Sequence, residues 1–293
     1  MSDALPQLDT TRGRRDRFWA RFARHKLGVL GVTVLALITL AVVFGPFLLP
    51  YDPNHIAVVD RNQAPSLAHL MGTDELGRDQ LARILDGGRL TLTVALAAVA
   101  FSLILGVLVG VLAGYAGKIV DNILMRGVDV FYSVPALFVV ILLVTLIGSG
   151  FWAIVIAIAA FSWMNTARLV RGGFLALKER EYVEAARGIG AGHLRIAFRH
   201  ILPGTVGPIV VAATIGIAVA ILVESALSFL GLGFQPPQAT WGGMLFEAQR
   251  AVVSQGMWWR GLFPGLMIFL VVLAVNYIGD GLSDALDPRR RAQ

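Results

Sequence analysis

The chain has 293 residues, 56% of them apolar and 15% charged, and its mean hydropathy is +0.72. Soluble domains carry about 25% charged residues, so this composition predicts an integral membrane protein. The formal charge of +6 does not indicate nucleic-acid binding, because the basic residues gather at the ends of apolar runs without interleaved aromatic residues. With no cysteine in the chain, disulfides, thiolate metal sites and cysteine nucleophiles are excluded.

The first apolar run extends from residue 27 to residue 49 and contains no charged side chain. As a helix it is roughly 34 Å long at about 1.5 Å per residue, enough to cross a hydrocarbon core of about 30 Å. It is too long for the core of a signal peptide, and no cleavage site with small residues follows it. Basic residues outnumber acidic ones before it, namely Arg12, Arg14, Arg15, Arg17, Arg21, Arg24 and Lys26 against Asp3, Asp9 and Asp16. We therefore expect an uncleaved first span whose amino end lies in the cytoplasm.

Residues 50–89 form a polar segment with three prolines, in which six acidic residues face four basic ones. That balance predicts the outer, periplasmic side of the membrane. The helical spacing of Leu81, Ile84 and Leu85 predicts a short helix over 74–85, lying along the outer interface.

The second span is predicted over 90–115. Within it a small residue recurs at every fourth position: Ser102, Gly106, Gly110 and Gly114. Such a stripe lets another helix backbone come close, and either an internal neighbour or a partner subunit could fill it. A short inner loop is expected over 116–129.

Residues 130–167 are 38 consecutive uncharged residues, about 57 Å if helical and close to twice the membrane thickness. We therefore expect a third and a fourth span that fold back at Gly148–Gly150. Asn165, near the inner end of the fourth span, is explained by helix capping or by snorkelling. Arg126 and Asp129 are three residues apart and are expected to pair.

A polar island of 36 residues, 168–203, separates the fourth span from the fifth. Good helix formers predict a helix over 174–187, and the three glycines within 188–192 are expected to end it. A second short helix is predicted over 193–199, before Pro203 opens the next apolar run. Basic residues outnumber acidic ones by seven to three, which predicts a cytoplasmic island. Small residues surrounded by charges are typical of a docking surface.

The fifth span is predicted over 205–230. It carries a second stripe of small residues at Ala212, Gly216 and Ala220. Its one carboxylate, Glu224, would cost about 3 kcal/mol at the bilayer centre, so it is expected to face protein or water and not lipid. Two interpretations remain open: Glu224 lines a polar path through the membrane, or it is bonded to a neighbouring helix or to the loop 231–237.

Residues 231–260 are expected outside, because glycines and prolines break the helix there. An interfacial helix is predicted over 241–253, and two tryptophans near the end of the segment suit an aromatic belt. The last span is predicted over 261–279, and Arg289–Arg291 closes the chain inside. Six spans with both termini in the cytoplasm satisfy every charge count, so the predicted fold class is an all-α, polytopic membrane protein with six transmembrane helices.

Enzymatic signatures are missing from the sequence. Gly117-Lys118 is followed by Ile119 and has no glycine five positions before it, so it is not a phosphate-binding loop. Neither His-Glu-x-x-His nor Gly-x-Ser-x-Gly occurs, and the histidines have no ligand spacing. We therefore expect no catalytic residue, no metal site, no cofactor and no nucleotide hydrolysis by this chain.

The polar island carries a motif of specific composition and spacing. Glu184-Ala185-Ala186, then Gly190, then Leu202-Pro203 resemble the EAA loop of bacterial ABC-importer permeases. In the family's usual pattern an isoleucine follows further along the loop after the glycine. This chain has His200 at that place, with Ile201 beside it. The resemblance implies that these residues form the coupling helix that seats on a cytoplasmic ATPase: Glu184, Ala185, Ala186, Gly190, Leu202 and Pro203.

Two other stretches are similar to the dipeptide, oligopeptide and nickel branch of that family, second-subunit (C) type. They are 71–79 (MGTDELGRD) and 227–237 (LSFLGLGFQPP). This resemblance implies the type I ABC-importer fold, with a first unit of residues 1–89 and a five-helix permease core of residues 90–293 that carries the coupling loop 168–204.

The same resemblance implies an inner-membrane permease subunit that forms half of the translocation pathway of an importer for peptides or a similar small solute. The implied partners are a second permease subunit, two cytoplasmic ATPase subunits, a periplasmic or lipid-anchored substrate-binding protein and membrane lipid. The segment 50–89 has an alternative interpretation, as a contact site for the binding protein. Glu224 likewise has an alternative interpretation, as a residue that lines the translocation pathway.

An ion-coupled carrier or channel acting without an ATPase is the competing function. Such a protein would need several ionisable groups at mid-membrane and two halves of similar hydropathy. Only Glu224 is a candidate, and no inverted repeat is evident. The sequence does not identify the solute.

Overall fold

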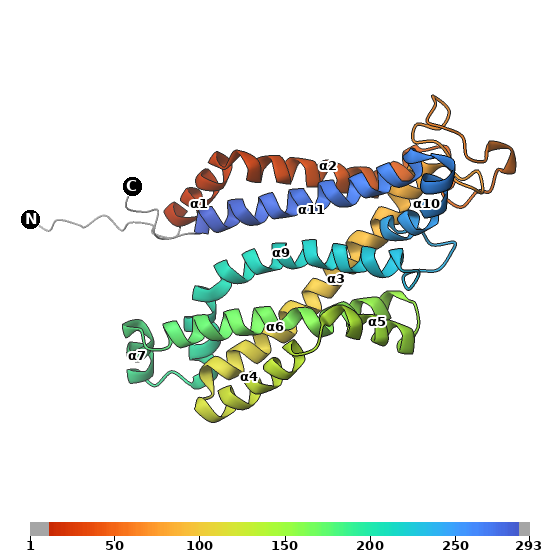
Figure 1. The fold of residues 1–293 in the computed structure, drawn as a ribbon. Helices are drawn as coiled ribbons and strands as arrows, with labels where there is room; N and C mark the ends of the chain where they lie inside the picture. Colours follow the sequence, from red (N-terminus) through yellow and green to blue (C-terminus); the bar gives the residue numbers. More distant parts are fainter. Residues whose placement is uncertain (1–11, 287–293) are drawn as a thin grey trace, which may run out of the picture.

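The computed structural model describes residues 12–286, with side chains described from Phe18 onward. The basic side chains before Phe18 and the triplet Arg289–Arg291, both used above to predict orientation, lie outside this part. The described chain is almost entirely helical (Figure 1). Its helices are α1 Arg12–Arg24, α2 Lys26–Leu48, η1 Val58–Asp60, α3 Gln80–Tyr115, α4 Lys118–Tyr132, α5 Ala136–Ile147, α6 Phe151–Leu177, α7 Glu181–Gly188, α8 His193–Arg195, the π-helix η2 Ile196–Ile201, α9 Leu202–Phe229, α10 Trp241–Gln255 and α11 Trp258–Leu286.

Within residues 12–286, five helices are long and apolar enough to cross a membrane: α2, α3, α6, α11 and the continuous helix from α8 through α9. A sixth span is obtained if α4 and α5, which are bent by 83° at Ser133–Pro135, are counted as one broken span. Pro135 explains the break, because proline cannot donate the backbone hydrogen bond that a continuous helix needs there. The predicted all-α, six-span fold is confirmed, with a third span that is bent.

The glycine stripe of α3 packs against α6. A Cβ at Gly106 would lie 2.7 Å from the backbone oxygen of Trp163, and one at Gly110 would lie 2.6 Å from that of Ala167. These distances are too short for any side chain, so the two helix backbones touch along the stripe. Of the two neighbours that the sequence allowed, the structure shows the internal one.

We expect Gly110→Val to destabilise the bundle by about 1 to 3 kcal/mol, because α3 and α6 must separate to admit the side chain. Gly127→Val on α4 is the matched control, since no atom lies within 4 Å of a Cβ built there. Thermal melting of the two purified variants in mild detergent compares them. Equal melting temperatures would contradict the close packing of α3 on α6.

Two expectations about local structure are wrong. The helix predicted over 74–85 is not a separate interfacial helix: α3 begins at Gln80, after the N-cap Asp79, and runs straight into the span. The expected loop 116–129 is mostly helix α4, whose charged residues alternate with apolar ones at helical spacing. The boundary proposed at residues 89 and 90 falls inside α3, and the division into two units stays a prediction.

The polar island also differs from the expected pair of helices. The helix predicted over 174–187 is interrupted at 178–180, where Arg180 has an extended backbone and becomes the N-cap of α7. Two acidic residues in the first turn of α7 favour a new helix start, because they interact well with its amino-terminal dipole. Pro203 does not begin a separate helix. Pro203 lies where the π-helix η2 passes into the α-helix α9 and the backbone hydrogen-bonding pattern changes. The N–H that proline lacks is therefore tolerated at this position.

The bundle has two distinct ends. Figure 1 shows α7 and α1 at one end, and α10 at the other end with the segment 50–79. The turn between α5 and α6 at Gly148–Gly150 is where the sequence predicts it. The interfacial helix predicted over 241–253 corresponds to α10, so both ends carry short helices in addition to the spans.

Candidate functional site

Helix α7 is held on a rigid base at its end of the bundle. Val183 and Ala186, three residues apart on one face, are buried. They belong to an apolar cluster with Phe174 of α6 and Ile201 of η2, among others. The helix is therefore attached by its inner face to the ends of two spanning helices.

The other face of α7 is exposed and mixed in character. Tyr182, Glu184 and Ala185 are exposed, and Ile189, just past the helix, has 87% of its surface exposed. Among the described residues Glu184 makes no ion pair. Gly190 has φ +79°, a left-handed conformation that favours glycine, and no atom lies within 4 Å of a Cβ built on it. This face can accept another surface without first breaking internal contacts.

The six residues predicted to form the coupling site divide into two groups. Glu184, Ala185, Gly190 and Pro203 are exposed, whereas Ala186 is buried and Leu202 is half-buried against the apolar cluster. The first group can touch a partner, whereas Ala186 holds α7 in place and Leu202 packs partly against the same apolar cluster. The structure brings all six to one end of the bundle, and their role in coupling stays a prediction.

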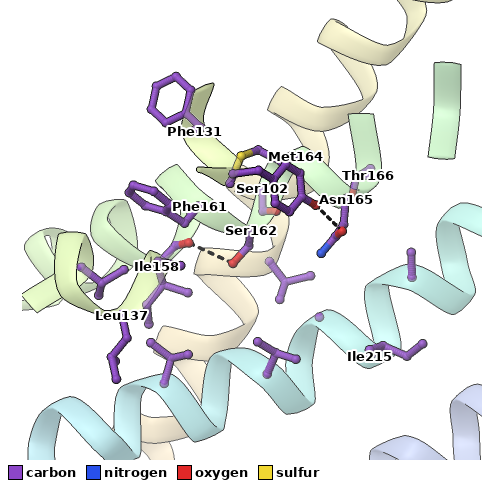
Figure 2. A pocket seen from close by; sticks show the side chains of 18 of the residues that line it. Ser102, Phe131, Leu137, Ile158, Phe161, Ser162, Met164, Asn165, Thr166 and Ile215 are labelled. Carbon is purple, nitrogen blue, oxygen red and sulfur yellow. Dashed lines mark hydrogen bonds between the residues drawn. The ribbon is translucent and has the colours of Figure 1, made fainter. Parts of the chain in front are cut away.

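A cavity of about 680 Å³ lies between α3, α4, α5, α6 and α9. Figure 2 shows Phe161, Ser162 and Asn165 of α6 on one side of it and Ile215 of α9 on the other. The lining is mostly apolar, with polar atoms from Ser102, Ser162, Asn165 and Tyr132. No Asp, Glu, Lys, Arg or His is among the lining residues, all of which lie in the described part of the chain.

Asn165, expected from the sequence to cap the fourth span or to snorkel, lines the cavity, a position that was not predicted. It accepts a hydrogen bond from the Tyr132 hydroxyl, and both side chains line the cavity. The available signal was its spacing of three from Ser162, which places the two on one face of a helix. The expected pair of Arg126 with Asp129 is wrong, because Asp129 binds Arg168 of α6 at 2.7 Å.

Glu224 is fully buried and is not among the residues that line the cavity. Its Oε1 accepts a hydrogen bond of 2.8 Å from Ser228, and the Ser228 hydroxyl accepts one of 3.3 Å from Thr240, the N-cap of α10. Its Oε2 has no hydrogen-bond partner among the described residues. The carboxyl group thus lies in a polar cluster where α10 joins α9, and its role in a pathway stays a prediction.

A buried network of charges joins the segment 50–79 to α3 and α10. The Asp74 carboxylate binds Arg78 and Arg83 at 2.7 Å each, and Glu247 binds Arg83 at 2.6 Å. Burial acts to raise the pKa of Asp74, but the charges of Arg83 and Arg78 outweigh it and hold that pKa below its ordinary value. The motif 71–79 contains two of the four residues, but no pattern in the sequence points to Glu247.

Comparison with known proteins identifies the family. Residues 106–292 match the family model described as "Binding-protein-dependent transport system inner membrane component", and residues 14–65 match "N-terminal TM domain of oligopeptide transport permease C".

The chain is 45% identical to the glutathione transport system permease protein GsiD of Pectobacterium atrosepticum, over 94% of this chain and 91% of that protein. It is 42% identical to the dipeptide transport system permease protein DppC of Bacillus subtilis, over 93% of this chain and 85% of that protein. Among solved structures, the inward-facing methionine ABC transporter MetNI contains a chain with the same fold. Its TM-score is 0.51 and its identity 20%, and the match covers 67% of this chain and 94% of that one.

The predicted resemblance is therefore confirmed at the level of the family. The match spans more than half of the chain, and the relatives are similar over nearly all of it. The chain belongs to the binding-protein-dependent inner-membrane permeases of ABC transport systems, as a C-type member of the dipeptide and oligopeptide group.

Proposed function

We propose that this chain is one of two non-identical permease subunits of an ATP-driven importer of di- or oligopeptides. In this proposal two cytoplasmic ATPases drive the cycle through the exposed face of α7, and a binding protein delivers the solute at the α10 end. The observation that carries the proposal is the mounting of α7: one face is fixed to α6 and η2, and the other is free for a partner.

This mounting gives α7 a direct mechanical connection to the cavity. Phe174 belongs to the apolar cluster under α7, and it lies in the same helix, α6, as the cavity residues Ser162 and Asn165. Ile201 belongs to η2, which continues into α9 and its cavity residue Ile215. Because a continuous helix moves as a rigid unit, a displacement of α7 shifts two walls of the cavity together.

The positive-inside rule supports the orientation. The segment around α7 carries seven basic residues against three acidic ones, and the segment 50–89 carries more acids than bases. We place α7 and both termini in the cytoplasm and α10 on the outer side.

The cavity supports a peptide as the solute and a second permease as its cover. Uncharged polar atoms from Tyr132, Ser162 and Asn165 can bond peptide groups, and a lining without charge does not trap a zwitterion by ion pairing. Relatives of the chain are named for dipeptide and glutathione transport. Apolar side chains on α5 such as Phe138, 70% exposed, suit burial against a second subunit that completes the pathway.

Filling the cavity is expected to block import without unfolding the protein. At Gly216 of α9 the nearest atom to a built Cβ is 3.5 Å away, so Gly216→Phe extends its ring into the cavity. Gly207→Phe on the same helix is the matched control, with the same 3.5 Å clearance and no place in the lining. We expect peptide uptake close to background for the first and substantial uptake for the second; equal uptake would remove the cavity from the pathway.

Reconstitution tests the proposal as a whole. The chain is placed in liposomes with the second permease, the ATPases and the binding protein, and uptake of labelled dipeptide is measured with and without ATP. Uptake that requires both ATP and the ATPases is the expected result. Uptake by the chain alone, driven by an ion gradient, would favour the carrier or channel instead.

A further inference from the structure

A second, smaller cavity lies at the α7 end of the bundle, away from the large one. It measures about 280 Å³ and is lined by Arg21 and Arg24 of α1, His25, and Asp284 and Ala285 of α11. We propose that it holds the phosphate group of an anionic phospholipid of the surrounding membrane. This inference does not depend on the solute or on the ATPase.

Helix α1 is amphipathic, as expected of a helix lying in a membrane interface. Phe18 and Phe22 lie one turn apart with Trp19 beside them, whereas Arg21 and Arg24 lie on a different face. Trp19 is 56% exposed, and its position suits the interfacial region that tryptophan prefers. Figure 1 shows α1 at an angle to α2 and beside the carboxyl end of α11.

The pocket is formed by fixed contacts, so α1 is held in place without a ligand. Phe22 is 8% exposed and packs over Gly28 of α2 and Gly281 of α11. A Cβ at Gly281 would lie 2.9 Å from the Phe22 ring, so the two glycines provide the space that the ring occupies. Between α1 and α2, His25 caps α2 by accepting a 2.9 Å hydrogen bond at Nδ1 from the Gly28 N–H.

The charges in the pocket match a phosphate ester. In the described part of the chain, neither guanidinium, Arg21 or Arg24, is in an ion pair or a hydrogen bond. The Asp284 carboxylate lies 3.7 Å from His25 Nε2. The two arginines outnumber that one acid, and guanidinium groups bind phosphate oxygens in pairs of hydrogen bonds. Basic pockets between helices at a membrane surface are suited to anionic headgroups.

The proposal commits to lipid as the source of the phosphate for a structural reason. Trp19 and Phe18 leave apolar surface beside the arginines that an acyl chain can cover. Free phosphate would bind the two arginines but would leave the apolar surface of Trp19 and Phe18 exposed to water.

Native mass spectrometry of the full-length protein, in the assembly in which it purifies, tests the site. The probes are phosphatidylglycerol and phosphatidylcholine with the same acyl chains, and inorganic phosphate in excess as a competitor. The test variant is Arg21→Gln/Arg24→Gln. The control is Arg195→Gln/Arg199→Gln, an exposed pair near the same end with the same loss of charge.

We expect the wild type and the control to retain phosphatidylglycerol in preference to phosphatidylcholine. The test variant is expected to bind it about 25-fold more weakly at low salt, since each arginine near the surface contributes about fivefold. Equal retention of phosphatidylglycerol by the test variant and the control would overturn the proposal. So would equal binding of the two lipids, or displacement of the lipid by inorganic phosphate, which would indicate a free-anion site.

Discussion

A Glu184→Arg substitution is expected to abolish ATP-driven import while the protein inserts in the membrane at the wild-type level. Glu184 is exposed and makes no ion pair among the described residues, so reversing its charge costs the fold only its favourable interaction with the α7 dipole, about 0.3 to 1 kcal/mol. At an interface the same change places a wrong charge against the partner, which costs several kcal/mol. Peptide uptake in reconstituted liposomes should fall at least about tenfold, as for loss of an interface hot spot.

The control for this change is Glu179→Arg. Glu179 is also exposed, but it lies before α7 and outside the predicted motif, so most uptake should remain. Gly190→Arg should also lower uptake, because its side chain meets no atom in the free protein and would protrude into the partner. A non-glycine residue at φ +79° adds about 1 to 2 kcal/mol of backbone strain of its own. Near-normal uptake by both motif variants, at normal protein levels, would contradict a coupling role for α7.

An Asp74→Asn substitution is expected to cost about 3 to 5 kcal/mol of the free energy of unfolding. Asparagine keeps the shape of the side chain and one acceptor oxygen. It places an amide N–H₂ against the guanidinium groups of Arg78 and Arg83, which are both buried. Two buried positive charges are then left with Glu247 alone, and thermal melting in mild detergent measures the loss.

Asp129→Asn is the matched control for this prediction. The ion pair of Asp129 with Arg168 has the same distance of 2.7 Å as that of Asp74 with Arg83, but its side chains are 53% and 46% exposed. Exposed pairs contribute about 0 to 1 kcal/mol. A loss of stability as large as that of Asp74→Asn would show that burial is not what makes the network strong.

The lowered pKa of Asp74 also predicts the direction of its pH dependence. The folded protein binds this proton more weakly than the unfolded chain does, so the contribution of Asp74 to stability is complete above the ordinary aspartate pKa of about 3.9. It is lost as the pH falls below that value through the folded pKa. Wild type and Asp74→Asn should therefore differ in melting temperature at neutral pH and converge in strong acid.

The sequence predicts the spans well because hydropathy and helix length act locally. The turn at Gly148–Gly150 and the close packing on the glycine stripe of α3 follow from residues that lie near one another in the chain. The helix α4 was missed because its charges resemble those of a loop, although their spacing is helical. The continuity of η2 into α9 was missed because Pro203 usually opens a helix.

Contacts between distant segments could not be predicted. Asp129 is close to Arg126 in sequence, yet it pairs with Arg168 because the packing of α4 on α6 brings that side chain nearer. The same holds for Glu247, which binds Arg78 within motif 71–79 and Arg83 after it only once α10 lies against α3. In the candidate site the motif residues were found, but the division of Glu184 and Ala186 into an exposed and a buried face needed the fold.

The central claim, that the exposed face of α7 meets an ATPase in the cytoplasm, is tested most directly by cross-linking from one cysteine. The chain has no cysteine of its own, so Ala185→Cys on α7 and Val253→Cys on α10 each provide a single thiol, and both positions are exposed. A thiol-linked photoreactive probe at position 185 should cross-link the chain to an ATP-binding subunit in native membranes. In a second measurement, a membrane-impermeant maleimide added from outside should react with the thiol at position 253 and not with the thiol at position 185. Labelling of position 185 from outside, or cross-linking to the ATPase from 253 and not from 185, would contradict the account.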